Sequence, residues 1–99
     1  LENVRLRNAD LRGAKLPGVK LTYADLGGAK LGYANLLFAN LSGANLTGAN
    51  LWNANLGYAS LSNGKLPGAD LRYANLRGAR LENANLERAN LGGAKLQQA

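Results

Sequence analysis

Few side chains of this chain are suited to chemistry. It has 99 residues with no His, no Cys and no Met, and its 12 Lys and Arg against 6 Asp and Glu give a formal net charge of +6. Without His or Cys, the chain lacks the residues on which most catalytic triads, structural zinc sites and disulfides are built. Acid–base or nucleophilic chemistry would therefore depend on carboxylates, Ser, Lys or Tyr.

The carboxylates and the glycine-rich stretches do not combine into a site. Asp10 and Asp70 fall on one side of the repeat described below, but three coils apart, about 14 Å at the usual strand spacing and too far for paired acid–base work. Gly-Gly-Ala-Lys at residues 27–30 and 92–95 lacks the first Gly and the Ser or Thr of a phosphate-binding loop. We therefore predict no catalytic residue, no cofactor and no metal ion, and expect that the chain is not an enzyme.

A five-residue repeat organises the whole sequence. Leu occupies every fifth position from Leu1 to Leu96, and we call each such Leu a centre. A small residue lies two positions before a centre, almost always Ala, with Val4, Val19 and Gly64 as the exceptions. The residue directly before the centre, which we call the polar position, is most often Asn and otherwise Asp, Ser, Lys or Arg. We call the two residues after the centre the corner residues.

A period of five excludes both regular elements along the whole chain. Five residues advance about 500° around a helix, so a Leu stripe would drift about 140° per repeat, and in a straight strand an odd period alternates faces. Ala-x-Leu nevertheless has the spacing that places two side chains on one side of an extended segment. Pro-Gly at residues 17–18 and 67–68 fits the central positions of a type II turn. Each repeat is therefore an extended side followed by a corner, and the chain coils.

The pattern Ala-(Asn/Asp)-Leu-x-x resembles that of the pentapeptide-repeat protein family, over the whole chain and without a gap. The resemblance implies an all-β fold, a right-handed quadrilateral parallel β-helix (a solenoid) with about five coils of four pentapeptides. Residues 1–99 would form one such domain, similar to the long regular tracts of cyanobacterial members. One departure is that Lys or Arg fills the polar position seven times, where the family prefers Asn or Asp.

Four sides per coil place most of the aromatic residues together. The side with centres Leu16, Leu36, Leu56, Leu76 and Leu96, taken with its two corners, holds five basic residues, no acidic residue and five of the six aromatic residues. From it we select ten candidate interaction residues, which we call the aromatic–basic surface: Arg12, Lys15, Tyr33, Leu37, Phe38, Trp52, Tyr58, Arg72, Tyr73 and Arg77. Trp52 and Arg72 occupy equivalent positions one coil apart, so a cation–π pair is expected. The competing interpretation is that stacked corner residues merely cover one another between coils.

These features favour a non-catalytic structural or interaction module, a rigid rod that presents the aromatic–basic surface to another protein. An alternative is binding to an anionic surface, either nucleic acid or membrane headgroups, because basic and aromatic residues alternate there. A third hypothesis, a gyrase-interacting DNA mimic, needs a negative surface, and the net charge of +6 argues against it. The repeat also allows self-association, end to end or side by side.

The sequence gives little on location or on the length of the natural protein. Its longest uninterrupted apolar stretch, residues 36–39, is far shorter than the roughly 20 residues of a membrane span, and no signal-peptide pattern is visible. With no targeting segment in this sequence, a cytoplasmic location is the default expectation. The chain begins without Met and ends inside a repeat, so we expect a fragment or domain of a longer chain.

Overall fold

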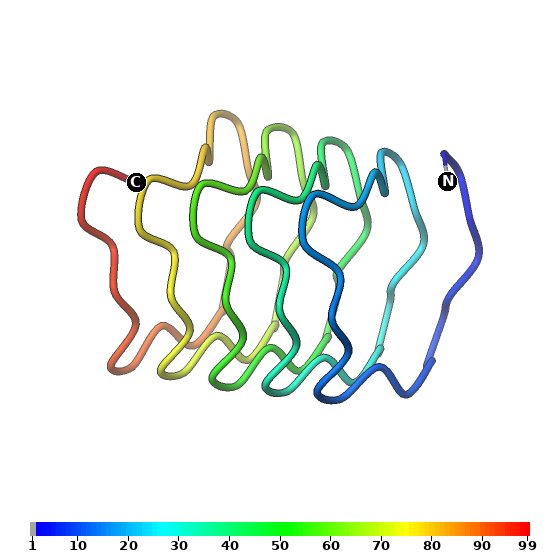
Figure 1. Cartoon of the computed structure of the whole chain (residues 1–99), viewed down its shortest axis with the longest axis horizontal. Coiled ribbons are helices and arrows are strands. Elements are labelled where there is room, and N and C mark those ends of the chain that lie inside the picture. Colours follow the sequence, from blue (N-terminus) through cyan, green and yellow to red (C-terminus); the bar gives the residue numbers. More distant parts are fainter. Residues whose placement is uncertain (1) are drawn as a thin grey trace.

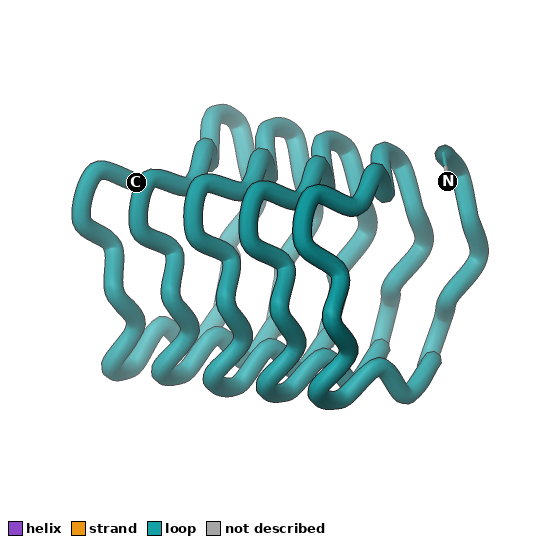
Figure 2. The backbone as a smooth tube through the Cα atoms, in the orientation of Figure 1, coloured by secondary structure: helices purple, strands orange, loops and turns teal. Residues whose placement is uncertain are grey.

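The backbone of the computed structural model, which describes residues 2–99, winds around one axis in stacked coils (Figures 1 and 2). Parallel bridges join polar positions that are 20 residues apart, from Arg5 with Asp25 to Asn75 with Lys95. One coil is therefore four pentapeptides, and the expected right-handed quadrilateral β-helix is confirmed. Within residues 2–99 the bridges are single residues separated by turns, with no helix and no longer strand. No described helix is thus long and apolar enough to cross a membrane.

Every corner has the same backbone conformation. The second corner residue has a positive φ at all positions from Asn3 to Gln98, and the N–H that follows it donates to the carbonyl of the preceding centre, as from Ala24 to Leu21 at 3.1 Å. This is the type II turn predicted for the two Pro-Gly corners, extended to the whole chain. Gly or Asn occupies most of these positions because both tolerate a left-handed backbone. The others carry larger side chains: Tyr23, Tyr33, Phe38, Tyr58, Tyr73, Arg88 and Gln98.

The polar position has a structural task that explains its preference for Asn and Asp. Each Asn or Asp there accepts a hydrogen bond from the N–H of the first corner residue, two positions on, at 2.9–3.3 Å. An oxygen on a short side chain thereby satisfies a donor that the turn leaves free. Where Lys15 and Lys65 replace it, the first corner residue is Pro17 or Pro67, which has no N–H.

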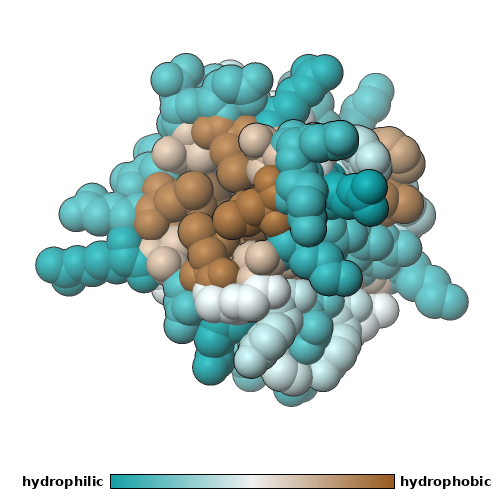
Figure 3. All heavy atoms as spheres, turned by 90° about the vertical axis from the view of Figure 1, so that its left-hand side faces the viewer, coloured by the Kyte–Doolittle hydropathy of each residue, from teal (hydrophilic) through white to brown (hydrophobic). Residues whose placement is uncertain are grey.

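The interior is a column of Leu and Ala shared by all four sides. In the middle coils, the Leu centres from Leu21 to Leu76 and most of the Ala residues between them are completely buried. Each buried Leu contributes on the order of 1.5–3 kcal/mol to folding. Toward residue 99 the Leu centres become partly exposed, reaching 44% at Leu96, and apolar side chains appear at the centre of this end face (Figure 3). The core thus gives every side the same rigid support.

Candidate interaction surface

Two adjacent columns of corners carry the predicted aromatic–basic surface. One column follows the centres Leu11, Leu31, Leu51 and Leu71 and contains Arg12, Tyr33, Trp52, Arg72 and Tyr73. The other follows the centres Leu16, Leu36, Leu56 and Leu76 and contains Leu37, Phe38, Tyr58 and Arg77. Equivalent corners stack along the axis at the repeat of the coil, so the structure places nine of the ten residues in these two columns, where the aromatic rings form two clusters. The tenth, Lys15, is at the polar position between the two columns.

The first cluster is built around the only tryptophan. The Tyr33 and Trp52 rings meet edge to face, with centroids 5.0 Å apart and an interplanar angle of 83°. Trp52 and Tyr73 repeat this arrangement at 6.2 Å and 86°. Such perpendicular packing is favoured by the quadrupoles of aromatic rings. Three residues from three successive coils therefore form one continuous aromatic cluster.

The second cluster stacks along the neighbouring corner. Phe38 and Tyr58 lie nearly parallel, with centroids 5.5 Å apart and an angle of 20° between their rings. Leu37 lies over Gly57, where an added Cβ would come within 3.0 Å of the Leu37 side chain. Tyr58 in turn covers Gly78, where an added Cβ would lie 2.5 Å from the ring. Glycine leaves the room that the side chain of the preceding coil occupies.

The aromatic residues are exposed and stand on an unfavourable backbone. Tyr33, Phe38, Tyr58 and Tyr73 have φ values between 55° and 61° and are 50–62% exposed. A bulky residue with positive φ is uncommon, because its Cβ crowds the backbone at a cost of about 1–2 kcal/mol relative to Gly. These positions thus bear large rings where Gly or Asn would suit the turn better.

The large rings at second corner positions are explained in part by their packing over a glycine of the next coil. Tyr23, outside the surface, lies over Gly43, and an added Cβ there would be 2.5 Å from its ring. Tyr58 and Tyr73 lie in the same way over Gly78 and Gly93. Ring-to-ring packing is different, since the three such contacts found within residues 2–99 all belong to the aromatic–basic surface.

Two of the arginines are neutralised, which corrects the sequence prediction. The Arg12 guanidinium donates to Asp10 at 2.8 Å from Nε and 2.6 Å from Nη2, and Arg72 donates to Asp70 at 2.9 and 2.8 Å. Asp10 and Asp70 are at polar positions of the adjacent side of the coil. The count of acidic residues on the aromatic side therefore did not include them. The predicted cation–π pair is also wrong: Arg72 is engaged by Asp70, and Trp52 packs against tyrosines.

The ion pairs shift the acidity of their members. Hydrogen bonds from the Arg12 side chain hold the pKa of Asp10 at about 2, below the ordinary 3.8. The Arg72 side chain lowers the pKa of Asp70 in the same way, and the two carboxylates raise the pKa values of their arginines. Lys15 and Arg77 of the surface, and Lys95 on the same side of the coil, have no carboxylate within 4 Å among the described residues, so the positive charge of this side depends on them.

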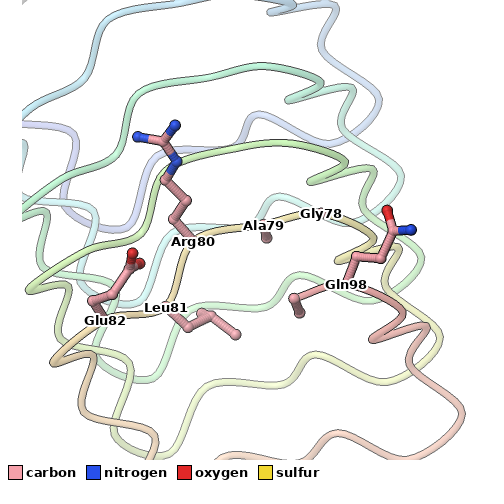
Figure 4. A pocket seen from close by; sticks show the side chains of 7 residues that line it. Gly78, Ala79, Arg80, Leu81, Glu82 and Gln98 are labelled. Carbon is pink, nitrogen blue, oxygen red and sulfur yellow. The ribbon is translucent and has the colours of Figure 1, made fainter.

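A hollow of about 360 Å³ borders the first aromatic cluster. It is lined by Arg12, Lys30, Gly32, Tyr33, Asn50, Trp52 and Arg72. It opens beside Gly32, because this residue has no side chain to fill the space between Arg12 and Trp52 in the same column. A second hollow, of about 420 Å³, lies between residues 78–82 and residues 98–99 at the end of the stack (Figure 4).

A profile described as pentapeptide repeats (8 copies) matches residues 1–36, 34–72 and 65–99, and so the whole chain. The chain belongs to the pentapeptide repeat family. A search of curated proteins by sequence gave no match. Pentapeptide repeat proteins are generally non-enzymatic structural modules.

Solved structures of other pentapeptide repeat proteins share this fold. The chain is similar to Rfr23 of the cyanobacterium Cyanothece 51142, with 43% identity and a TM-score of 0.88 over 89% of this chain. It is also similar to HetL of Nostoc sp. strain PCC 7120, a protein involved in heterocyst differentiation regulation, with 38% identity and a TM-score of 0.84 over 99% of the chain. A protein from the thylakoid lumen of Arabidopsis thaliana gives 34% identity and 0.63 over 84%. The chain spans 60% of Rfr23, 56% of HetL and 61% of the plant protein.

Sequence reasoning missed four residues next to the surface of this pentapeptide repeat protein. Asp10 and Asp70 neutralise the arginines, while Lys30 and Asn50 line the hollow. A signal for the ion pairs was present, because Asp-Leu-Arg at 10–12 and 70–72 places both charged side chains outward, two residues apart. Lys30 and Asn50 share a side with Asp10 and Asp70, so considering this side together with the corner that follows it would have joined them to Arg12 and Trp52.

Proposed function

We propose that this chain is a non-catalytic interaction module, whose rigid coil presents the aromatic–basic surface to a partner protein. The observation that carries the proposal is the clustering of surface rings from successive coils, Tyr33 with Trp52 and Tyr73, and Phe38 with Tyr58. All of these rings are exposed except that of Trp52, which is half-buried. Exposed clusters of large apolar side chains are characteristic of interaction sites, and Trp, Tyr and Arg are enriched among residues that dominate binding energy. The likeness to HetL, a protein involved in regulation, agrees with a binding role.

The backbone cost supports the same proposal. Gly and Asn fill most second corner positions at little strain, yet four rings of this surface occupy left-handed positions. Covering the next coil explains a single Tyr, as at Tyr23, but does not require rings that touch each other. A surface that a partner contacts would benefit from a rigid, preformed aromatic cluster, because little side-chain entropy is then lost on binding.

Site-specific photocrosslinking tests the proposal. A photoreactive phenylalanine analogue at position 58 should crosslink a partner in an extract of the source organism, and the same analogue at position 23 should not. Tyr23 is a matched control because both tyrosines are exposed, have positive φ and lie over a glycine of the next coil. Equal crosslinking at both positions, or none at position 58, would contradict the proposal.

Binding to an anionic surface is the second candidate, and the ion pairs weaken it. Arg12 and Arg72 are already paired with Asp10 and Asp70, so only part of the basic charge on this side is free for phosphate groups. Association with oligonucleotides or anionic vesicles would depend steeply on salt. Strong, salt-sensitive binding at 50 mM salt that is lost on replacing Lys15, Arg77 and Lys95 would revive this candidate.

A further inference from the structure

The hollow beside Trp52 borders a backbone donor that lacks the acceptor found in its neighbours. The hollow lies on the side of the coil whose centres are Leu11, Leu31, Leu51, Leu71 and Leu91. In four of its five coils, the residue at the polar position supplies an oxygen to the N–H of the first corner residue. The donor–acceptor pairs are Arg12 to Asp10 (3.3 Å), Trp52 to Asn50 (2.9 Å), Arg72 to Asp70 (3.1 Å) and Gly92 to Asn90 (3.0 Å). In the remaining coil Lys30 occupies the polar position, and the Gly32 N–H donates to no acceptor within residues 2–99.

Three features coincide at Gly32 and at one other corner of the described residues. Lys15 and Lys65 also replace an Asn or Asp, but Pro follows them and no N–H is left. Lys20 precedes Thr22, which does not line either hollow. A free N–H, a cation without a carboxylate within 4 Å and an open hollow meet at Gly32 with Lys30 and at Glu82 with Arg80. The Glu82 carboxylate lines the second hollow, so of the two hollows only the one beside Gly32 has a lining without an acidic side chain.

The lining of the hollow is rich in donors. Lys30 presents an ammonium group, Trp52 an indole N–H, and Arg12 and Arg72 present guanidinium groups that are partly used by Asp10 and Asp70. The side-chain oxygen of Asn50 already accepts a hydrogen bond from the backbone N–H of Trp52 at 2.9 Å, which leaves the indole N–H without this acceptor. Such a lining is complementary to an acceptor that carries negative charge.

We propose that this hollow takes the carboxylate of an acidic side chain from the partner protein. One carboxylate oxygen accepts the Gly32 N–H, as the Asn50 oxygen does for Trp52, and Lys30 supplies the opposite charge. The inference rests on the proposed function, since it specifies the chemistry of the partner at the same surface. It adds Lys30 and Gly32 to the binding residues.

The aromatic side chains that line the hollow and the net charge of the chain limit further which molecule can occupy the hollow. Tyr33 and Trp52 line the hollow, so an apolar residue beside the acidic one would pack against them. There is room at the floor, because a Cβ added at Gly32 would meet only the Trp52 carbonyl oxygen, at 3.6 Å. A second copy of the chain is a poor occupant, because its own net charge is +6. The occupant is therefore an acidic segment with apolar neighbours.

Intrinsic fluorescence can test this directly, because Trp52 is the only tryptophan and lines the hollow. We would titrate the chain with the blocked tripeptide acetyl-Leu-Glu-Leu-amide and with acetyl-Leu-Gln-Leu-amide as the uncharged analogue. The Glu peptide should give a saturable change in Trp52 emission, weakened by added salt. The Gln peptide should bind at least about tenfold more weakly, as expected for the loss of one charged hydrogen bond.

Lys30→Asn is the decisive variant. Asn at position 30 would remove the cation and offer its own oxygen to the Gly32 N–H, so the Glu peptide should bind about tenfold or more weakly. Folding should be preserved, since Asn is the commonest residue at the polar position. Lys65→Asn is the matched control: it changes charge at the same repeat position but precedes Pro67, so binding should stay within about twofold, as is usual for a distant surface charge.

Several outcomes would overturn the inference. These are a Trp52 emission that does not respond to the Glu peptide, an equal response to the Gln peptide, or unchanged binding by Lys30→Asn. Tighter binding of an oligonucleotide in the same hollow, sensitive to Lys30→Asn, would assign it to nucleic acid instead. Crosslinking at position 58 without peptide binding would overturn this inference alone, whereas peptide binding with equal crosslinking at positions 58 and 23 would overturn only the proposed function.

Discussion

The aromatic–basic surface and the opposite side of the coil stand on the same core but use their corners differently. The opposite side has centres Leu26, Leu46 and Leu66, which are as completely buried as Leu36 and Leu56. Outside these centres, the opposite side joins coils through polar contacts, such as Arg7 with Asp25 at 3.3 Å and Ser62 with Glu82 at 3.2 Å. The aromatic side has a polar contact of this kind at its polar positions, from Asn75 to Asn55 at 3.1 Å, but its corner residues join coils through rings.

This difference shows that the repeat separates stability from recognition. Inward Leu and Ala residues fix the coil on every side, and the polar position satisfies the turn. The corner residues are left to vary, because a turn needs only a tolerant residue at its second position. Function in this chain is therefore expected at the corners, and substitutions in the core and at the corners of the two sides should have different effects.

The largest effect should come from the shared core. Leu46→Asp on the opposite side and Leu56→Asp on the aromatic side should each destabilise the fold by more than about 4 kcal/mol, because each loses a buried Leu and places a charge in an apolar column. Circular dichroism during urea unfolding would measure both. If one variant remains folded while the other does not, the two sides do not rest on an equivalent core.

Glycine corners should respond according to the ring above them. Gly48→Ala on the opposite side should cost about 1–2 kcal/mol, since its φ is 64° and a Cβ there meets open space. Gly78→Ala should cost more, because its Cβ would also lie 2.5 Å from the Tyr58 ring. In a Tyr58→Asn background the cost of Gly78→Ala should fall to that of Gly48→Ala, as read from urea midpoints. An unchanged cost would show that the ring does not constrain Gly78.

Ring packing should appear as a coupling energy. A double-mutant cycle with Phe38→Asn and Tyr58→Asn should give a coupling of about 0.5–1.5 kcal/mol, in addition to the area that each ring buries. Asn is chosen because it tolerates the left-handed corner, as Asn53 and Asn63 do. The control cycle pairs Tyr23→Asn with Tyr58→Asn, which should be additive within about 0.5 kcal/mol. Coupling in both cycles, or in neither, would refute a special role for ring packing.

The smallest effect should be a dependence of stability on pH. The pKa of Asp10 is lowered to about 2 from 3.8 and that of Asp70 is also lowered, so the folded state favours the ionised forms. Their stabilisation is therefore present above the unfolded pKa and is lost as the pH falls through the folded values, between about pH 5 and pH 1. The Tm of the wild-type chain should exceed that of Asp10→Asn/Asp70→Asn at about pH 6, and the difference should shrink as the pH falls and vanish near about pH 1. A difference that stays undiminished down to about pH 1 would exclude the ion pairs as its cause.

The sequence alone was sufficient for the coil, its core and its corners. Leu at every fifth position, a small residue two before it and Gly or Asn at the corner are local requirements, and each recurs in every pentapeptide. A feature that repeats can be inferred from one repeat, because all copies share one environment. The inward Leu column and the turn at Pro67-Gly68 were predictable for this reason. The number of sides and the handedness came from resemblance to a known family.

Only the tertiary structure decided which contacts the corner residues make. Arg72 could reach Trp52 in the preceding coil or Asp70 two residues away, and the direction of its side chain settles this in favour of the carboxylate. The hollow likewise depends on residues 20 apart, because Gly32 leaves space only between Arg12 and Trp52, and its N–H is free only because Lys30 replaces an oxygen-bearing residue. Contacts between coils join side chains that no single pentapeptide contains, and the geometry of stacking selects among them.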